Sequence, residues 1–467
     1  MSRFSLGAAG ALTLVMACQY DPEPPVLHYS LSEDTLALDE YGRPIVPGKV
    51  REHILGSLEM LFGSPAHPQY MLLAEWADAG FDPNYPQFPA DDMGSGELDG
   101  EWDAIVADNT RRFAEQLAHI DAGEYESVKT PRGAPDLRAE WADLLATQAD
   151  FEQAEEFRGE ARRLFEEYYP TLRDSSELYR TQCLHCHGTE GGGNGPTADF
   201  LDPRPRDYRL GVFKFTALKD KANPRREDLY RILSQGVTGT AMPSFMRFSR
   251  SELHGLVDYV RLLSIRGMVE RDLRVTYENE DPLTPEYVAE SYKSIWERWQ
   301  RASESVIAYD GEVPAPTPEG IARGRELFMD AGKGNCQSCH GASGRGNGDS
   351  AFVTDEHGDR MAKPDDWGNS IMPRNLRLGI NRGGSRPIDI YRRIYAGING
   401  TQMPALGESK DADGNPLLTP EELWNIVHYV RSLGERPPPV HVASSGHSAS
   451  SEPRSSSGHS EGSGSGH

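Results

Sequence analysis

The feature that most constrains this chain is the pattern Cys-x-x-Cys-His, which occurs twice, at 183–187 and 336–340. This is the spacing at which c-type haem is attached to a polypeptide. Two thiols three residues apart on one helical turn can add to both vinyl groups of one porphyrin, and the next residue can ligate the iron. The pattern assigns haem attachment to Cys183, Cys186, Cys336 and Cys339 and proximal iron ligation to His187 and His340.

Two other sites use the Cys-x-x-Cys spacing. One is a thioredoxin-like dithiol, and the other is half of a zinc site. Neither needs a His directly after the second Cys, and the repetition of the whole pattern favours haem. The chain has five cysteines, and the two patterns use four of them. Only Cys18 is left over, so no pair remains for a structural disulfide.

The similarity between the two halves extends beyond the cysteines. Gly-Asn-Gly follows each pattern, and Gly-Thr-x-Met-Pro comes later, at 239–243 and 400–404. Each half then has a helix-start signal, Ser249-x-x-Glu or Thr419-x-x-Glu. Apolar residues follow at helical spacing, and they recur 170 positions later (423 − 253). One large offset indicates two copies of a module rather than a solenoid.

Each copy resembles a class I cytochrome c, a small all-helical fold that surrounds one haem. The resemblance implies a sixth iron ligand, a Met on a loop before the last helix. Met242 and Met403 occupy that place. A thioether is a soft ligand that favours reduced iron and raises its potential. For Met246 and Met372 we expect only a role as core filler.

The same resemblance suggests residues that support the haem. A basic side chain often pairs with a haem propionate, and Arg206 and Arg374 lie at matching places. A backbone carbonyl accepts the N–H of the proximal His, which orients the ring. In the family a Pro supplies this carbonyl, and Pro196 is its counterpart, whereas the second copy has Asp349 there.

The N-terminus predicts export. Arg3 precedes an apolar run over 6–17 that is too short to span a bilayer and is typical of a signal peptide. Residues 15–18 resemble a bacterial lipobox, which implies lipidation of Cys18. The alternative is an ordinary export signal cleaved near Ala17. Both readings place the protein outside the cytoplasmic membrane, where c-type haem is attached. We expect a periplasm-facing lipoprotein on the inner or outer membrane.

Helical patterns also occur outside the two copies. We expect helices from Val50 to a stop at Gly63, over 101–122 and over 139–169. Another helix begins at Pro285, and its apolar stripe predicts a buried helix that bridges the two copies.

The predicted fold is all-α, with two tandem cytochrome c-like helical domains preceded by a helical N-terminal region. Its parts are a signal peptide (1–17), an anchor spacer (18–48), a helical region of unknown role (49–173), module 1 (174–266), a linker with the bridging helix (267–316), module 2 (317–434) and a Pro/Ser/Gly/His-rich disordered tail (435–467).

Charge limits the range of partners. The chain has 48 basic and 72 acidic residues, a net charge of −24. This excess argues against nucleic acid or an anionic membrane surface as a partner. It suits docking to a basic patch on a redox protein, although it could equally serve solubility alone.

These features favour an electron carrier over an enzyme. The leading hypothesis is a membrane-tethered protein with two covalently attached haem c groups. It would pass electrons between a donor such as a quinol-oxidising complex and a terminal oxidase or reductase in a respiratory chain. One alternative is a diheme enzyme of the peroxidase type, in which one iron has an open position. Another is a cytochrome subunit of a larger dehydrogenase, with residues 50–172 as its docking part.

Overall fold

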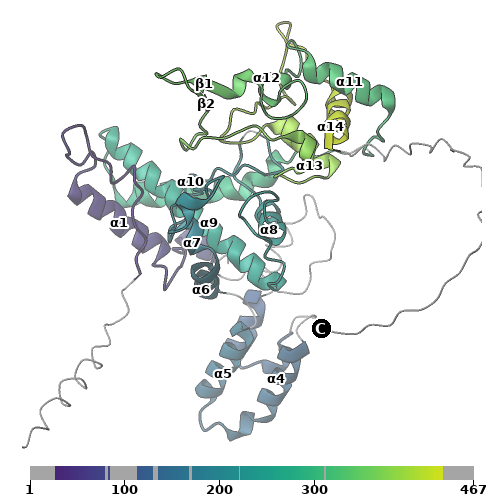
Figure 1. The fold of residues 1–467 in the computed structure, drawn as a ribbon. Helices are drawn as coiled ribbons and strands as arrows, with labels where there is room; N and C mark the ends of the chain where they lie inside the picture. The colour runs from purple at the N-terminus through teal and green to yellow at the C-terminus, as the bar shows by residue number, and fades with distance from the viewer. Residues whose placement is uncertain are drawn as a thin grey trace, which may run out of the picture. The chain divides into compact units, whose positions relative to one another are not determined.

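The computed structural model describes residues 27–78, 83–84, 113–129, 135–167, 171–219, 221–309 and 312–434. Within these ranges the chain is mainly helical, as predicted, and its strands β1 (Phe352–Thr354) and β2 (Arg360–Ala362) form one short antiparallel hairpin (Figure 1). No helix in the described ranges has the length and apolar character needed to cross a membrane. The predicted signal peptide, Cys18 and the C-terminal tail lie outside the described residues.

The first helix of the N-terminal region ends where the sequence predicts. Helix α1 stops at Phe62, and Gly63 follows with a positive φ of 66°. The predicted helix over 139–169 is instead two helices, separated by residues 147–153. The Thr147 hydroxyl donates to the Leu144 carbonyl (2.8 Å), a local bond that competes with continued helix. The described elements of this region are α1 (Gly48–Phe62), α2 (Ala74–Asp78), helical residues 113–122, η2 (Tyr125–Ser127), α4 (Pro135–Ala146), η3 (Gln148–Asp150) and α5 (Ala154–Glu167).

The two modules repeat one arrangement of helices. In each module the helix before the Cys-x-x-Cys-His pattern packs against the last helix, α6 against α9 and α11 against α14. Module 1 consists of α6 (Leu172–Gln182), α7 (Leu184–His187), η4 (Ala198–Phe200), α8 (Arg226–Gln235) and α9 (Arg250–Glu278). Module 2 consists of α11 (Pro318–Met329), α12 (Gln337–His340), η6 (Asp349–Ala351), β1, β2, η7 (Leu376–Leu378), α13 (Pro387–Ala396) and α14 (Pro420–Gly434).

Both predicted capping boxes are present. The Ser249 hydroxyl accepts the Glu252 N–H (3.2 Å), and the Glu252 carboxylate accepts the Ser249 N–H (2.7 Å). Thr419 and Glu422 make the same exchange at 3.2 and 3.1 Å. These bonds satisfy N–H groups that a helix start otherwise leaves open. Helix α9 continues to residue 278, beyond the expected end of module 1 at 266.

Three hydrophobic cores hold the described chain. The first joins α1, α6, α8, α9 and α10 (Pro285–Gln300), and the second belongs to module 2. The third joins residues 113–122 to α4 and α5. The stripe on α10 is buried as predicted, but it packs into the first core. There Tyr292 lies edge-on against Phe62, with ring centroids 5.4 Å apart. A 3-10 turn, η5 (Arg301–Ser305), then leads toward module 2.

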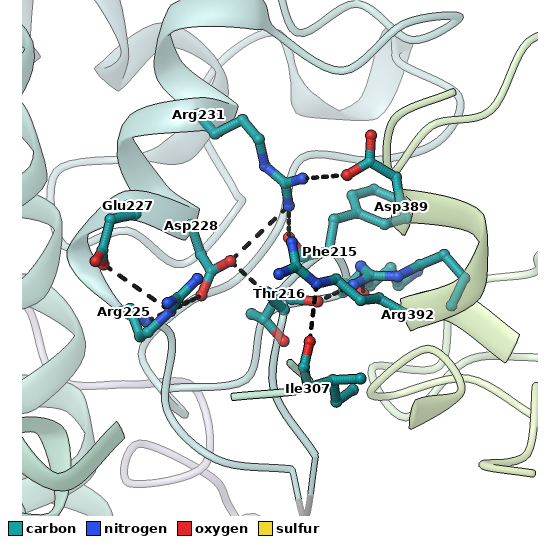
Figure 2. A network of polar contacts seen from close by, with 12 residues as sticks. Phe215, Thr216, Arg225, Glu227, Asp228, Arg231, Ile307, Asp389 and Arg392 are labelled. Carbon is teal, nitrogen blue, oxygen red and sulfur yellow. Dashed lines mark hydrogen bonds and ion pairs between the residues drawn. The ribbon is translucent and has the colours of Figure 1, made fainter. Parts of the chain in front are cut away.

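Modules 1 and 2 meet through a polar network around α8 and α13 (Figure 2). Both helices carry Arg-x-x-Asp-x-x-Arg, with the second aspartate 161 positions after the first (389 − 228). The Arg231 guanidinium of module 1 donates to the Asp389 carboxylate of module 2 at 2.7 Å. Arg392 donates to the carbonyl of Ile307 in the linker at 3.2 Å. The interface is therefore built from buried charges and from backbone carbonyls.

Candidate functional site

The Cys-x-x-Cys-His segments fold as one short helical turn each. In module 1 the Cys183 carbonyl accepts N–H groups from Cys186 (3.1 Å) and His187 (2.9 Å). This turn places both cysteines and the His within one helical repeat, as the expected chemistry requires. Burial raises the pKa of the Cys183 thiol to about 12, so the thiol stays protonated at neutral pH.

Module 2 repeats this geometry. The Cys336 carbonyl accepts N–H groups from Cys339 (3.3 Å) and His340 (2.8 Å). Burial likewise raises the pKa of the Cys336 thiol to about 12. None of the four cysteines of the two patterns forms a disulfide within the described chain.

Each proximal His is oriented by a backbone carbonyl. His187 Nδ1 lies 3.1 Å from the carbonyl oxygen of Arg206, and His340 Nδ1 lies 3.2 Å from that of Arg374. Because a carbonyl only accepts, Nδ1 carries the proton in both rings and Nε2 keeps its lone pair. The prediction that the Pro196 carbonyl accepts the His187 N–H is therefore wrong. The acceptor lies later in each loop, at Arg206 and at Arg374.

Burial keeps both imidazoles neutral. It lowers the pKa of His187 to about 4, although the bond to the Arg206 carbonyl acts in the opposite direction. Burial also lowers the pKa of His340. A neutral imidazole with a free Nε2 is the form that binds a metal.

A Gly-Asn-Gly segment folds back onto each short helix. Its first glycine donates to the carbonyl of the proximal His, at 2.9 Å in module 1 and 2.8 Å in module 2. Its last glycine donates to the carbonyl of the second Cys, at 3.1 and 2.9 Å. A Cβ on Gly195 would overlap the Leu184 carbonyl oxygen, and one on Gly348 would overlap that of Ser338. Glycine is required here because two backbones touch.

The two Gly-Thr-x-Met-Pro loops have matching internal bonds. The N–H of Met242 donates to Thr240 Oγ1 at 3.1 Å, and that of Met403 donates to Thr401 Oγ1 at 3.2 Å. Each Thr hydroxyl donates in turn to the carbonyl three residues earlier, at 2.8 Å in both modules. Both Met side chains are partly buried against the core of their own module.

The prediction that Met246 and Met372 fill the core is wrong. Met246 is 73 % exposed and Met372 is 51 % exposed, so neither fills a core. The neighbouring Phe245, which is 4 % exposed, takes the buried position beside Met246.

The two arginines predicted to face a propionate lie at the boundary between the modules. The Arg206 guanidinium stacks on the Trp367 ring of module 2, with Cζ 3.5 Å from the ring centroid. It lies 3.8 Å from the Asp365 carboxylate. Arg374 donates from Nε to the Ile380 carbonyl at 2.9 Å. Their pairing with a propionate stays a prediction.

Sequence reasoning missed Trp367 and Asp365. Both come from an inserted segment of module 2 that contains the β1–β2 hairpin. This insertion lengthens the connection from His340 to Arg374 to 34 residues, against 19 from His187 to Arg206. Because module 1 has no counterpart to this segment, comparison of the two copies could not reveal it.

Comparison with known families matches the two modules separately. Residues 170–260 match the family described as cytochrome C oxidase, cbb3-type, subunit III, and residues 321–434 match the family described as cytochrome c. The chain contains two cytochrome c-type domains. Domains of this type imply covalently bound haem c, haem-based electron transfer and redox partners, and they are typically extracytoplasmic.

One solved structure is similar to this chain over part of its length. It is a chain of the Kuenenia stuttgartiensis reducing HAO-like protein complex Kustc0457/Kustc0458. The two sequences are 27 % identical, and the match covers 56 % of this chain and 96 % of that chain with a TM-score of 0.41. No curated protein matches the chain.

The residues of each cytochrome domain fit a covalently bound haem. Each domain presents two free thiols on one helical turn and a neutral imidazole whose Nε2 is available. Each also holds a Met in a loop braced by a Thr. One thioether and one imidazole per iron are the Met/His ligands found in cytochromes c.

Proposed function

We propose that this protein is an electron carrier with two covalently attached haem c groups, one per module. Cys183 and Cys186 would hold the first haem, and Cys336 and Cys339 would hold the second. A haem c supplies an iron that exchanges one electron at a time. The observation that supports this function most is the equivalence of the two sites, whose loops make the same hydrogen bonds in both modules.

The proposed axial ligands are His187 with Met242 and His340 with Met403. The Arg206 and Arg374 carbonyls hold each imidazole in one tautomer, so that Nε2 rather than Nδ1 would ligate the iron. Thr240 and Thr401 fix the backbone that carries each thioether. Two held ligands suit a carrier, because an iron that keeps its coordination rearranges little when its charge changes.

The proposed setting is a respiratory chain outside the cytoplasmic membrane. We expect Cys18 to carry a lipid that tethers the protein to the inner or outer membrane. The net charge of −24 supports docking to basic patches on a redox donor and acceptor. A quinol-oxidising complex and a terminal oxidase fit these roles.

Spectroscopy of the purified protein tests the carrier function against the peroxidase-type alternative. A carrier with two His/Met sites has low-spin iron in the oxidised, half-reduced and reduced states. Its reduced form binds carbon monoxide poorly, and it turns over hydrogen peroxide negligibly. A high-spin iron in the half-reduced state together with rapid peroxide turnover would reject the carrier and favour the enzyme.

A further inference from the structure

The N-terminal segment of the described chain, residues 27–46, is bound to module 1. The Tyr29 and Tyr259 hydroxyls lie 2.9 Å apart, and both residues are buried. The Thr35 hydroxyl donates to a carboxylate oxygen of Glu270 on α9 at 2.8 Å. Glu270 is buried as well, so this bond to a charged group is a strong one. These bonds fix the N-terminal segment on module 1.

The same segment reaches the loop that folds back onto the first haem-binding turn. The Glu33 carboxylate accepts a bond from the Asn194 side-chain amide at 3.1 Å and lies 3.6 Å from the Arg209 guanidinium. Asn194 is the middle residue of the Gly-Asn-Gly segment of module 1. The N-terminal segment is therefore attached to the surroundings of the first haem site.

A hairpin within this segment, residues 36–45, exposes large apolar side chains. They are Leu36, Leu38, Tyr41 and Ile45, with exposed fractions from 43 to 74 %. Fourteen large hydrophobic side chains are exposed within the described ranges, and four of them fall in these ten residues. Single exposed apolar residues are ordinary, but such a concentration indicates a contact surface.

The turn of the hairpin is fixed by its own hydrogen bonds. Asp39 Oδ1 accepts the N–H groups of Tyr41 and Arg43, both at 2.9 Å. The Asp39 N–H donates to the Arg43 carbonyl at 2.8 Å. Gly42 supplies the positive φ of 75° that the turn requires. Tyr41, the most exposed of the four apolar residues, is therefore held at the tip.

The hairpin carries little of the chain's negative charge. Its charged residues are Asp39, Glu40 and Arg43, a net charge of −1. Asp39 pairs with Arg43 at 2.8 Å, and the Arg43 guanidinium lies over the Tyr41 ring, with Cζ 5.1 Å from the centroid. Tyrosine rings and basic side chains gather at the headgroup level of bilayers, beside aliphatic side chains that enter the acyl region. The composition of the hairpin matches that environment.

The expected lipid on Cys18 keeps a bilayer within reach of this hairpin. Leu27, where the described chain begins, is nine positions after Cys18 (27 − 18). Nine residues span at most about 32 Å when fully extended. Stable attachment to a membrane takes a second contact besides one lipid group. A bilayer is therefore the surface that the hairpin meets first.

We propose that the hairpin 36–45 is a second membrane contact, which places Tyr41 and its apolar neighbours at the headgroup level of the bilayer that holds Cys18. This inference rests on the tether in the proposed function. Two contacts fix the orientation of a protein on a membrane, whereas one tether leaves it free to turn. Because Glu33 and Thr35 attach the segment to module 1, module 1 faces the bilayer. Its haem is then the entry point for electrons from a donor in the membrane.

The β1–β2 hairpin of module 2 is a matched control. Its turn repeats the same bonds, since Asp355 Oδ1 accepts the N–H groups of His357 at 2.9 Å and of Asp359 at 2.8 Å. It also exposes two apolar side chains, Val353 and Met361, which pair across its strands. Its tip carries a histidine where the N-terminal hairpin carries a tyrosine. A membrane contact specific to the N-terminal hairpin leaves this one in water.

The test is photolabelling of the full, haem-loaded and lipidated protein on phosphatidylcholine vesicles. The vesicles include a phosphatidylcholine with a photoactivatable group on one acyl chain, and mass spectrometry locates the label. We expect label on the peptide that contains residues 36–45 and none on the peptide that contains residues 352–362. This result should not change at high salt, because the contact is apolar rather than ionic.

Two double variants sharpen the test. Leu38→Ser combined with Tyr41→Ser should lose the label, although the protein still sediments with the vesicles through Cys18. Val353→Ser combined with Met361→Ser should keep it. On a supported phosphatidylcholine bilayer, the Soret band of the wild type should show linear dichroism. The dichroism should fall toward zero in the first variant and stay unchanged in the second.

A wild type that sediments with the vesicles but carries no label on residues 36–45 would overturn the inference and favour a protein partner for the hairpin. The tether and the haem sites of the proposed function would then stand. Equal label on residues 352–362 would also overturn it, because the contact would not be specific. A wild type that does not sediment at all would reject the tether and the hairpin contact together. The labelling of the wild type decides the question even where a variant fails to fold.

Discussion

Arg231 of module 1 and Asp389 of module 2 form a partly buried ion pair, with Nη1 and Oδ1 2.7 Å apart. The Asp389 side chain is 3 % exposed and that of Arg231 is 18 % exposed. Arg386 adds two more bonds to the same carboxylate, both at 3.0 Å. A charge taken out of water needs such partners, because its desolvation otherwise costs several kcal/mol. The contact between the modules is therefore specific rather than incidental.

Asp389→Asn should weaken the chain at this interface. It removes the negative charge 2.7 Å from the Arg231 guanidinium and leaves Asp228, 3.8 Å away, as the remaining carboxylate, which costs about 3 kcal/mol of unfolding free energy. Denaturant unfolding of the wild type and the variant at neutral pH measures the loss. The control is Asp413→Asn in an exposed turn, which should cost almost nothing. Equal stability of the wild type and Asp389→Asn would show that the pair does not hold the modules.

The pKa of Asp389 predicts how the stability that the ion pair contributes depends on pH. Burial would raise the pKa of Asp389, but hydrogen bonds from Arg386 and the charge of Arg231 outweigh it and hold the pKa below its ordinary value. The unfolded chain therefore takes up the proton first as the pH falls below about 4. The stability gap between wild type and Asp389→Asn should be constant from pH 5 to 8 and should narrow in stronger acid. A gap that widens in acid would contradict this assignment.

Removing one pair of thiols should remove one haem. We expect Cys183→Ala combined with Cys186→Ala to give about one covalent haem per chain instead of two, because the second site keeps its own helical turn and loop. A pyridine haemochrome assay against protein concentration gives the ratio. The reciprocal variant at Cys336 and Cys339 should give the same value. Loss of both haems in either double variant would mean that the modules do not load independently.

Lipidation of Cys18 should decide where the protein fractionates. The wild type should sediment with membranes and be released by detergent, since an acyl chain contributes about 0.8 kcal/mol per buried methylene. Cys18→Ser should block that processing and leave the precursor uncleaved. A wild type found wholly in the soluble periplasmic fraction would reject the anchor while leaving the haem sites unaffected.

Features set by short local patterns were predictable from the sequence. The two haem-binding turns, the stop of α1 at Gly63 and the capping boxes at Ser249 and Thr419 each depend on residues within a few positions of one another. Their spacing alone determines which groups can meet, so sequence reasoning located them.

Features that depend on the path of a long loop were not predictable from the sequence. The acceptor for His187 is the Arg206 carbonyl rather than Pro196, because the path of the 19-residue connection decides which carbonyl reaches the ring. Trp367 escaped notice because its segment is an insertion that only module 2 has. Met246 is exposed because the neighbouring Phe245, which has the larger apolar surface, occupies the buried position.

The axial methionines make the sharpest test of the proposed ligand sets. Replacing Met242 or Met403 by His should lower the potential of one haem only, because a thioether favours reduced iron and an imidazole does not. The near-infrared sulfur-to-iron band should fall to about half its wild-type intensity in either single variant and vanish in the double variant. Met60→His is the matched control, since Met60 is 50 % exposed on α1 and packs in neither module's Met loop. A full-intensity band in Met242→His would mean that another residue ligates the first iron. We expect Met242 rather than Met246 to be the ligand, because Thr240 braces the loop around Met242 and Met246 is exposed.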